Sequence, residues 1–289
     1  MVWAAAAGLL FGVFQAFNRR ANQLVDAYRG AFALILISAI SVGIVAALTQ
    51  DLSLLSEAPA TSFLFFLGAG AFQFFVAWTF LGLSQQRIGA SSTGVVIAAA
   101  PIGATILAAL VLSEPLPALT VLGVLLAAAG VALISLGQGN SSLSFGAVPW
   151  FALGCVLCWS ISPLLIRLGL EELPSPLIGV TVGLIGAATL YGVFLALGGG
   201  PSGKPAESAL PWLLLAGVVV AGAITSQWTS FDLIEISVAV TLLQLAVPTV
   251  VLLAPLVVRT EAERITPALV GGMGAVLAGS ILVIWAVQA

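Results

Sequence analysis

Long apolar runs separated by short polar stretches dominate the chain. Each run is about 20 residues long, the length that an α-helix needs to cross ~30 Å of hydrocarbon. The runs do not alternate apolar and polar residues as the strands of a membrane barrel do. The pattern predicts an all-α polytopic membrane protein with ten transmembrane helices, of which the first is a span rather than a removed signal peptide. The runs lie roughly at residues 2–19, 27–49, 63–84, 90–112, 117–137, 146–168, 175–197, 210–231, 236–258 and 267–287.

The pattern repeats itself halfway along the chain. In the fourth run Pro101 is followed 13 positions later by Glu114, and in the ninth run Pro248 is followed by Glu261 at the same interval. The two prolines are 147 positions apart, close to half of the 289 residues. This duplication predicts two five-helix repeats that form one transport unit. Because five is odd, the repeats must lie inverted in the membrane, as in many secondary transporters. Their predicted bounds are 1–138 and 145–289.

Composition agrees with a membrane location and removes several classes of function. Hydrophobic residues make up 61% of the chain and charged residues only 7%, against ~45–50% and ~25% in soluble domains. The net charge is −3 and no basic tract is present to neutralise a phosphate backbone, so nucleic acid is not expected as a partner. Cys155 and Cys158 lack the further ligands that a tetrahedral zinc site needs. We therefore expect no metal and no other cofactor.

Basic residues are distributed unevenly between the two sides that this topology predicts. Only Arg167 falls on one side, and the other side holds Arg19, Arg20, Arg29, Arg87, Lys204, Arg259 and Arg264. By the positive-inside rule the richer side is cytoplasmic, which places both termini outside. We expect an integral protein of a bacterial or archaeal inner (cytoplasmic) membrane. The acids gather at the outer mouth, which favours a cationic or zwitterionic solute over an anion.

The end of the predicted first repeat carries a family resemblance. It reads LSQQRIGASSTGVVIAAAPIGATILAALVLSEPLPALTVLGVLLAAAGVALIS. Together with ten spans in two five-helix repeats, this resembles the drug/metabolite transporter superfamily, specifically its ten-helix EamA-like branch. The matching features are the proline of the fourth span, the glutamate after it and the Gly-x6-Gly fifth span. The resemblance implies a metabolite exporter or exchanger, often for amino acids, without a built-in ATPase. The chain departs from many relatives because it lacks a basic N-terminal tail.

Polar and aromatic side chains near the middle of the predicted spans are the candidate solute-binding residues. Amide dipoles can replace the hydration of a solute without burying a net charge, and tryptophan adds an apolar face and one donor. The alternative is that they tie helices together, a contribution of ~0.6 kcal/mol per pair on average. The candidates are Gln15, Asn18, Gln73, Trp78, Ser160, Gln227, Trp228 and Gln244.

Pro101 and Pro248 lie near the centres of the fourth and ninth spans and are the candidate hinges. A proline removes one backbone hydrogen bond and clashes with the preceding turn, so it interrupts a helix. In lipid the freed carbonyl must be satisfied by a neighbour or face a wet cavity. The matched placement of the two prolines favours hinges beside the solute, and tolerated kinks are the alternative.

Four acidic residues near span ends are the candidates for gating or for coupling to an ion: Glu114, Asp232, Glu235 and Glu261. Histidine is absent, so coupling to protons would need a carboxylate. Asp232 and Glu235 lie at the turn between the eighth and ninth spans, where a solvated outer loop is the alternative. Glu114 and Glu261 each follow a span. They either close a gate against an arginine or stabilise the start of the next helix by ~0.3–1 kcal/mol, and we expect the latter.

These features predict a carrier, monomeric or homodimeric, that exports or exchanges small polar or amphipathic metabolites such as amino acids by alternating access. Its cavity would lie between the first, third and fourth spans and the sixth, eighth and ninth. The alternative is a flippase or scramblase of lipids or lipid-linked headgroups, which a lateral groove lined by Gln and Ser would favour. An enzyme is not expected, because the chain has neither histidine nor a G-x-x-x-x-G-K-[ST] loop.

Overall fold

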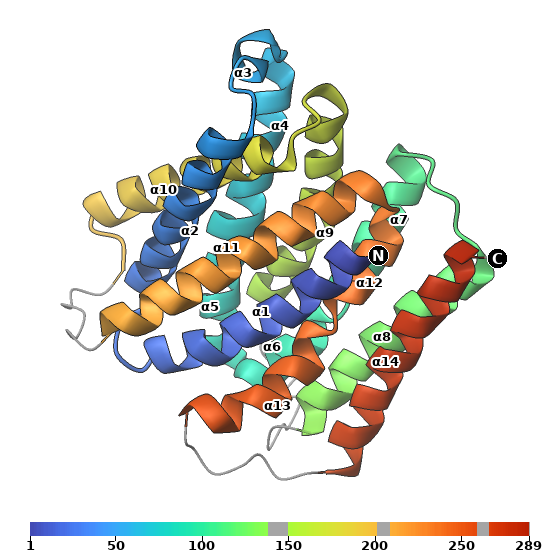
Figure 1. Cartoon of the computed structure of the whole chain (residues 1–289). Helices are drawn as coiled ribbons and strands as arrows, with labels where there is room; N and C mark the ends of the chain where they lie inside the picture. Colours follow the sequence, from blue (N-terminus) through green and yellow to red (C-terminus); the bar gives the residue numbers. More distant parts are fainter. Residues whose placement is uncertain (138–149, 201–208, 259–265, 289) are drawn as a thin grey trace.

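The computed structural model describes residues 1–137, 150–200, 209–258 and 266–288, and Figure 1 shows how its helices are arranged. Within these ranges the chain forms fourteen α-helices and one π-helical turn, with no strand. The first half holds α1 (Val2–Ala21), α2 (Ala27–Thr49), α3 (Leu54–Glu57), α4 (Ala60–Gly70), the π-helical turn (Ala71–Val76), α5 (Ala77–Ile88), α6 (Ala90–Ile97), α7 (Ala100–Val111) and α8 (Ala118–Gly137). The second half holds α9 (Trp150–Glu172), α10 (Pro176–Ala196), α11 (Leu210–Leu233), α12 (Ile236–Leu243), α13 (Ala246–Val258) and α14 (Pro267–Gln288).

Side-chain caps fix the starts of two of the long helices. The Asp26 carboxylate accepts a hydrogen bond from the backbone N–H of Arg29 at 3.0 Å, so α2 begins at the next residue after Asp26. The Ser175 hydroxyl accepts from the backbone N–H of Ile178 at 3.4 Å, and Pro176 takes the first position of α10, where its missing N–H costs nothing. Local sequence therefore sets where these spans enter the apolar layer.

Nine helical segments of the described chain are long and apolar enough to cross a membrane. They are α2, α4 to α5, α6 to α7, α8, α9, α10, α11, α12 to α13, and α14. The helix α1 has 20 residues but is not among them, because Gln15, Asn18, Arg19 and Arg20 make its second half polar. The all-α polytopic membrane fold is confirmed, whereas the count of ten spans is not.

Two spans are interrupted, and the interruptions lie at matching places. The fourth predicted span breaks between α6 and α7 at Ala98, and the ninth breaks between α12 and α13 at Gln244. Pro101 is the second residue of α7 and Pro248 the third residue of α13. The prolines thus start the second half of each broken span, where a first-turn N–H needs no helical partner.

Most of the packing joins helices from the two halves of the chain. The helix α1 packs against α11 and α13, whereas α9 packs against α4, α5 and α7. The helices α2 and α10 pack side by side, as do α8 and α14, which stand together at one edge of the bundle in Figure 1. Each pairing therefore has a counterpart in which the halves are exchanged. The largest fully buried side chains include Trp228, Tyr191 and Phe66, and the rings of Phe66 and Trp228 pack together between α4 and α11.

Glycines allow α8 and α14 to approach until their backbones touch. A Cβ placed on Gly130 would lie 2.6 Å from the carbonyl oxygen of Gly272, and one on Gly272 would lie 2.7 Å from the carbonyl oxygen of Gly130. Gly123 and Gly279 show the same reciprocal contact, at 2.8 and 2.5 Å. Small residues are the usual means of close packing in membranes. The matched glycines of the fifth and tenth predicted spans therefore pack against each other.

Candidate functional site

Gln73 lies on the π-helical turn inside the span Ala60–Ile88. Isolated π-turns widen an α-helix locally and are frequent at functional sites. The indole N–H of Trp159, on α9, donates to the backbone carbonyl of Gln73 at 3.3 Å. One turn earlier, Gly70 touches the backbone of Gly183 on α10 so closely that no side chain fits. Neighbours on two helices therefore hold the widened turn in place.

The side-chain amide of Gln73 joins α11 to this turn. Its Nε2 donates to Oε1 of Gln227 at 2.6 Å, and its Oε1 accepts from Nε1 of Trp228 at 3.2 Å. Trp228 is 0% exposed and Gln73 is 5% exposed. Because both ends of the Gln73 amide are used, the three predicted site residues form one hydrogen-bonded cluster, in which Gln227 is half-buried. The structure brings these three residues together, and their role in binding a solute stays a prediction.

Aromatic rings surround this cluster. Phe66 lies against Trp228 with ring centroids 5.8 Å apart, and Phe14 stacks on Trp78 at 6.1 Å with an interplanar angle of 14°. Phe74 meets the same Trp78 edge-on at 5.8 Å, a favourable geometry for two quadrupoles. Trp228 is sealed in the core, whereas Trp78 is only half-buried. Of the two predicted tryptophans, Trp78 is therefore the one with surface left for a solute.

Ser160 and Gln244 lie at the two helix breaks. The buried Ser160 hydroxyl, on α9, donates to the carbonyl oxygen of Ala100 in the first turn of α7 at 3.1 Å. Gln244 is the half-buried residue that ends α12, with φ −66° and ψ −13°. Ala99, between α6 and α7, is exposed. Ser160 therefore acts as a helix-to-helix contact, while Gln244 belongs to the break itself.

Gln15 and Asn18 lie on the second half of α1 and are not in the amide cluster. Gln15 is exposed. The Oδ1 atom of Asn18 is buried and has no hydrogen-bond partner among the described residues. An unpaired buried acceptor costs about 1–3 kcal/mol, so such an atom marks a place where a donor from water or a solute fits.

Glu114 caps a helix, although not the next one in sequence. Both of its carboxylate oxygens accept from the backbone N–H of Ile236, at 2.9 and 3.0 Å, at the start of α12. Burial raises the pKa of this carboxyl above its usual value, while the N–H groups of Ile236 and Ser237 and the Arg167 guanidinium act in the opposite direction. The acid thus stabilises the ninth predicted span rather than the fifth.

Arg167, on α9, holds the other side of the same turn. Its Nη1 donates to the carbonyl oxygens of Phe231 and Asp232, the latter at 3.1 Å, where α11 ends. A cation there also complements the negative end of the helix dipole. Asp232 contributes its backbone to this contact, and Glu235 is the residue that precedes α12. The fourth predicted gating residue, Glu261, lies outside the described residues.

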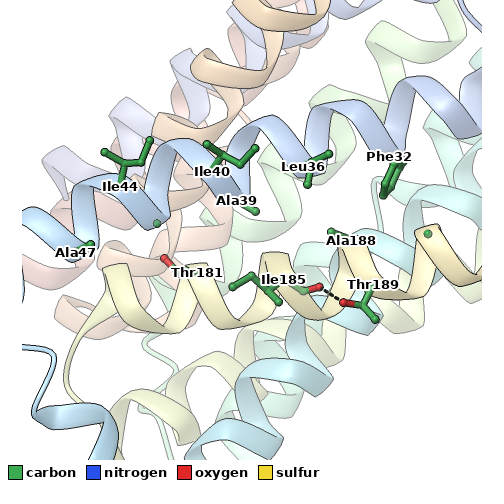
Figure 2. A pocket seen from close by; sticks show the side chains of 12 residues that line it. Phe32, Leu36, Ala39, Ile40, Ile44, Ala47, Thr181, Ile185, Ala188 and Thr189 are labelled. Atoms are coloured by element: carbon green, nitrogen blue, oxygen red, sulfur yellow. Dashed lines mark hydrogen bonds between the residues drawn. The ribbon is translucent and has the colours of Figure 1, made fainter.

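A separate groove runs between α2 and α10, as Figure 2 shows. It encloses about 610 Å³, and its lining is apolar except for Thr181 and Thr189. Both hydroxyls donate to carbonyl oxygens of their own helix at 2.8 Å, to Leu177 and Ile185. The groove therefore offers acyl chains an apolar surface but lacks the amide and hydroxyl lining that a headgroup path needs. The remaining lining residues are Phe32, Leu36, Ala39, Ile40, Gly43, Ile44, Ala47, Ile185, Ala188 and Gly192.

Sequence reasoning missed three contributors to these sites. Trp159 stands next to Ser160 in the middle of a span, far from the interfacial positions where tryptophan usually gathers, and this position was the available signal. Arg167 was noticeable as the one basic residue on its side. Nothing in the sequence marked Phe14 as the partner of Trp78, because that contact joins residues 64 positions apart in different helices.

Comparisons with known proteins agree with this architecture. A solved crystal structure superposes with a TM-score of 0.82 over 100% of this chain and 98% of its own, at 17% sequence identity, so the likeness concerns the fold alone. The comparison with curated proteins gave no match. Residues 1–136 match the EamA-like transporter family. The first half of the chain is therefore similar to EamA-like transporters, which is consistent with the drug/metabolite transporter superfamily and suggests a membrane transporter of small solutes.

Proposed function

We propose that the protein is a carrier that exports or exchanges small polar or amphipathic solutes, such as amino acids, by alternating access. Two inverted five-helix repeats, 1–138 and 145–289, would form its two moving parts. The observation that carries the proposal is the hydrogen-bonded cluster of Gln73, Gln227 and Trp228, which places uncharged polar groups in the middle of two spans. Polar groups at that depth are expensive and mark solute paths more often than lipid-facing surfaces.

The solute would bind at the half-buried edge of this cluster rather than inside it. Trp78 supplies a half-buried aromatic ring there, and amide groups supply hydrogen bonds without a net charge. The unpaired Oδ1 of Asn18 adds an acceptor, which suits an ammonium or amide donor. This chemistry supports a zwitterionic or cationic solute over an anion.

The matched helix breaks would supply the movement. Pro101 and Pro248 lack the N–H that would close a continuous helix across each break. Replacing either proline with alanine would favour a continuous helix and should slow transport while leaving expression intact. Wild-type transport rates in both variants would remove the hinge from this mechanism.

The test is solute flux through the pure protein in proteoliposomes. Vesicles are loaded with a mixed pool of amino acids and amines, and uptake and release are followed with and without a pH gradient. A fluorescent-lipid scrambling assay runs in parallel. Exchange of a few amino acids without lipid movement is expected, and Trp78→Ala should weaken the apparent affinity for them.

Other outcomes would overturn the proposal. Lipid scrambling without solute flux would replace the carrier with a flippase, a function that the apolar lining of the α2–α10 groove does not favour. A strict preference for organic anions would contradict the assignment of the solute class. With seven of eight basic residues on one side, we further propose an inner-membrane location with both termini outside.

A further inference from the structure

We propose that Arg167 and Glu114 form a clamp that closes one end of the carrier in this structure, and that Arg20 is the corresponding gate residue at the other end. This inference rests on the proposed alternating access and names the side chains that stabilise each state. End A is the end where α7 and α11 finish and α12 begins, and end B is the end where α1 and α5 finish and α6 begins.

At end A the turn between α11 and α12 is held from two helices at once. Arg167 of α9 donates to the carbonyl oxygen of Asp232 at 3.1 Å and to that of Ile234 at 3.4 Å. Glu114, which follows α7, accepts from the N–H of Ile236. All of these bonds join a charged side chain, Arg167 or Glu114, to backbone groups at a helix end. Charge makes them stronger than neutral hydrogen bonds.

The clamp links parts that must separate for end A to open. Glu114 belongs to the first half of the chain, whereas the turn that it caps belongs to the second half. Behind the clamp α7 packs against α12, and α9 packs against both α7 and α11. Opening end A would therefore break the Glu114 cap and part the α7–α12 contact.

End B contains the corresponding parts in a different arrangement. Arg20 precedes Arg167 by 147 positions, the same spacing as the two prolines. Its guanidinium Nη1 donates to Oε1 of Gln23, three residues away, at 2.8 Å. The same spacing pairs the α11–α12 turn of end A with the turn between α5 and α6 around Gly89 at end B. Arg20 thus makes a local contact where Arg167 makes an interhelical one.

Helix packing is also less extensive at end B than at end A. The counterpart of the α7–α12 pair is α6–α13, which is not among the extensively packed pairs in the described parts of the chain. Instead α6 packs against α5, α8 and α9, and α13 packs chiefly against α1. Gln15 on α1 and Ala99 at the α6–α7 break are both exposed. In the proposed cycle this arrangement corresponds to a state that is closed at end A and open at end B.

The experiment measures distances between spin labels by pulsed electron resonance, with no solute needed. In a Cys155→Ala/Cys158→Ala background, one label pair replaces Leu116 and Leu233 at end A. A second pair, in a separate protein, replaces Asn22 and Gln86 at end B. All four positions are exposed. Arg167→Ala and, independently, Glu114→Ala should lengthen the end-A distance and shorten the end-B distance in a new population.

Further variants show whether a change in the two distance populations comes from the clamp. Loss of a charge-assisted bond should change the ratio of the two populations by about tenfold or more, with Arg167→Lys between the wild type and Arg167→Ala. Arg20→Ala should move the ratio the opposite way.

The proposal fails if Arg167→Ala and Glu114→Ala, both folded by thermal unfolding, keep wild-type distances. It also fails if Arg20→Ala shifts the ratio in the same direction as Arg167→Ala. Shifted distances in a protein without solute flux would support the clamp and sink the transport proposal. Solute flux in a protein whose distances do not change in either clamp variant would support the transport proposal and contradict the clamp.

Discussion

Gln73 shows how a single polar side chain can organise a membrane interior. Its amide uses its Nε2 and Oε1 atoms to bind Gln227 and Trp228, and its backbone carbonyl accepts from Trp159. Three elements, the π-helical turn, α9 and α11, therefore converge on one residue. In a medium without water these partners are the only ones available, so the cluster is specific as well as stabilising.

Replacing Gln73 with leucine should destabilise the protein by about 1–3 kcal/mol, because the buried indole N–H of Trp228 and the half-buried amide of Gln227 lose their partner. The measurement is the free energy of unfolding in detergent micelles by titration with a denaturing detergent. Gln15→Leu is the matched control: it is the same substitution at an exposed position and should change stability little. The double variant Gln73→Leu/Gln227→Leu should cost less than the sum of the two single variants. Additive costs would show that the two amides are not coupled.

Glu114 should give stability a pH dependence of a definite sign. Burial raises the pKa of this carboxyl above its usual 4.5, so folding opposes its ionisation. The contribution of Glu114 to the free energy of unfolding should therefore be highest below pH 4.5. It should fall as the pH rises through the raised pKa. The neighbouring charges are Arg167, which limits the shift, and Glu235, which adds to it.

The measurement compares thermal unfolding of the wild type and Glu114→Gln between acidic and neutral pH. The glutamine keeps an acceptor for the Ile236 N–H but cannot ionise. The unfolding temperature of the variant should therefore rise relative to that of the wild type as the pH rises. Glu57→Gln removes the same charge from an exposed position on α3 and should follow the wild-type profile. If the unfolding temperature of the variant instead fell relative to that of the wild type as the pH rises, the N–H groups and Arg167 would outweigh burial in setting the pKa of Glu114.

At the scale of elements, the α8–α14 pair depends on the absence of side chains. Gly130→Ala should destabilise the protein by about 1–3 kcal/mol, because its Cβ would press on the backbone of Gly272 and Val276. Gly274→Ala is the control on the same helix pair, since open space surrounds that position. There the better helix propensity of alanine should leave stability unchanged or raise it by up to ~1 kcal/mol. Equal effects of the two substitutions in detergent unfolding would contradict this packing.

Helix boundaries were predictable from sequence, and helix irregularities only in part. The run predicted at 27–49 is α2 at Ala27–Thr49, because apolar length and the Asp26 cap are local properties. The prolines correctly marked two disturbed spans. Their position after the break, rather than at its centre, depends on where a first-turn N–H needs no partner. The π-helical turn at Gln73 had no local signal, since contacts from α9 and α10 hold it.

At the scale of the whole molecule, the sequence predicted the class of fold and the candidate polar residues, but not their grouping. Gln73, Gln227 and Trp228 meet, whereas Gln15 lies exposed on α1 and Ser160 binds the backbone of α7. Which amides converge depends on the rotation of each helix about its axis. That rotation follows from long-range packing, which apolar periodicity constrains weakly in spans that are apolar on most sides.

The interlocking of the two halves leads to a prediction about assembly. The helix α1 packs against α11 and α13, and α9 packs against α4, α5 and α7, so each half lends its first long helix to the other. A half expressed alone would leave those surfaces, including the glycine face of α8 or α14, without a partner. We therefore expect residues 1–137 and 145–289 to be unstable separately and stable together.

Coexpression of the two fragments, with an affinity tag on one of them, tests this prediction. The untagged fragment should copurify in equal amount, and the complex should elute and melt close to the intact chain, because the helix contacts between the two halves are retained. The matched control expresses each tagged fragment alone, where aggregation or degradation is expected. A fragment that purifies alone as a stable monomer would mean that the contacts between α1 and α11, and between α8 and α14, are secondary to contacts within each half. The alternating movement proposed above would then have to occur between two independently folded bodies rather than within one shared core.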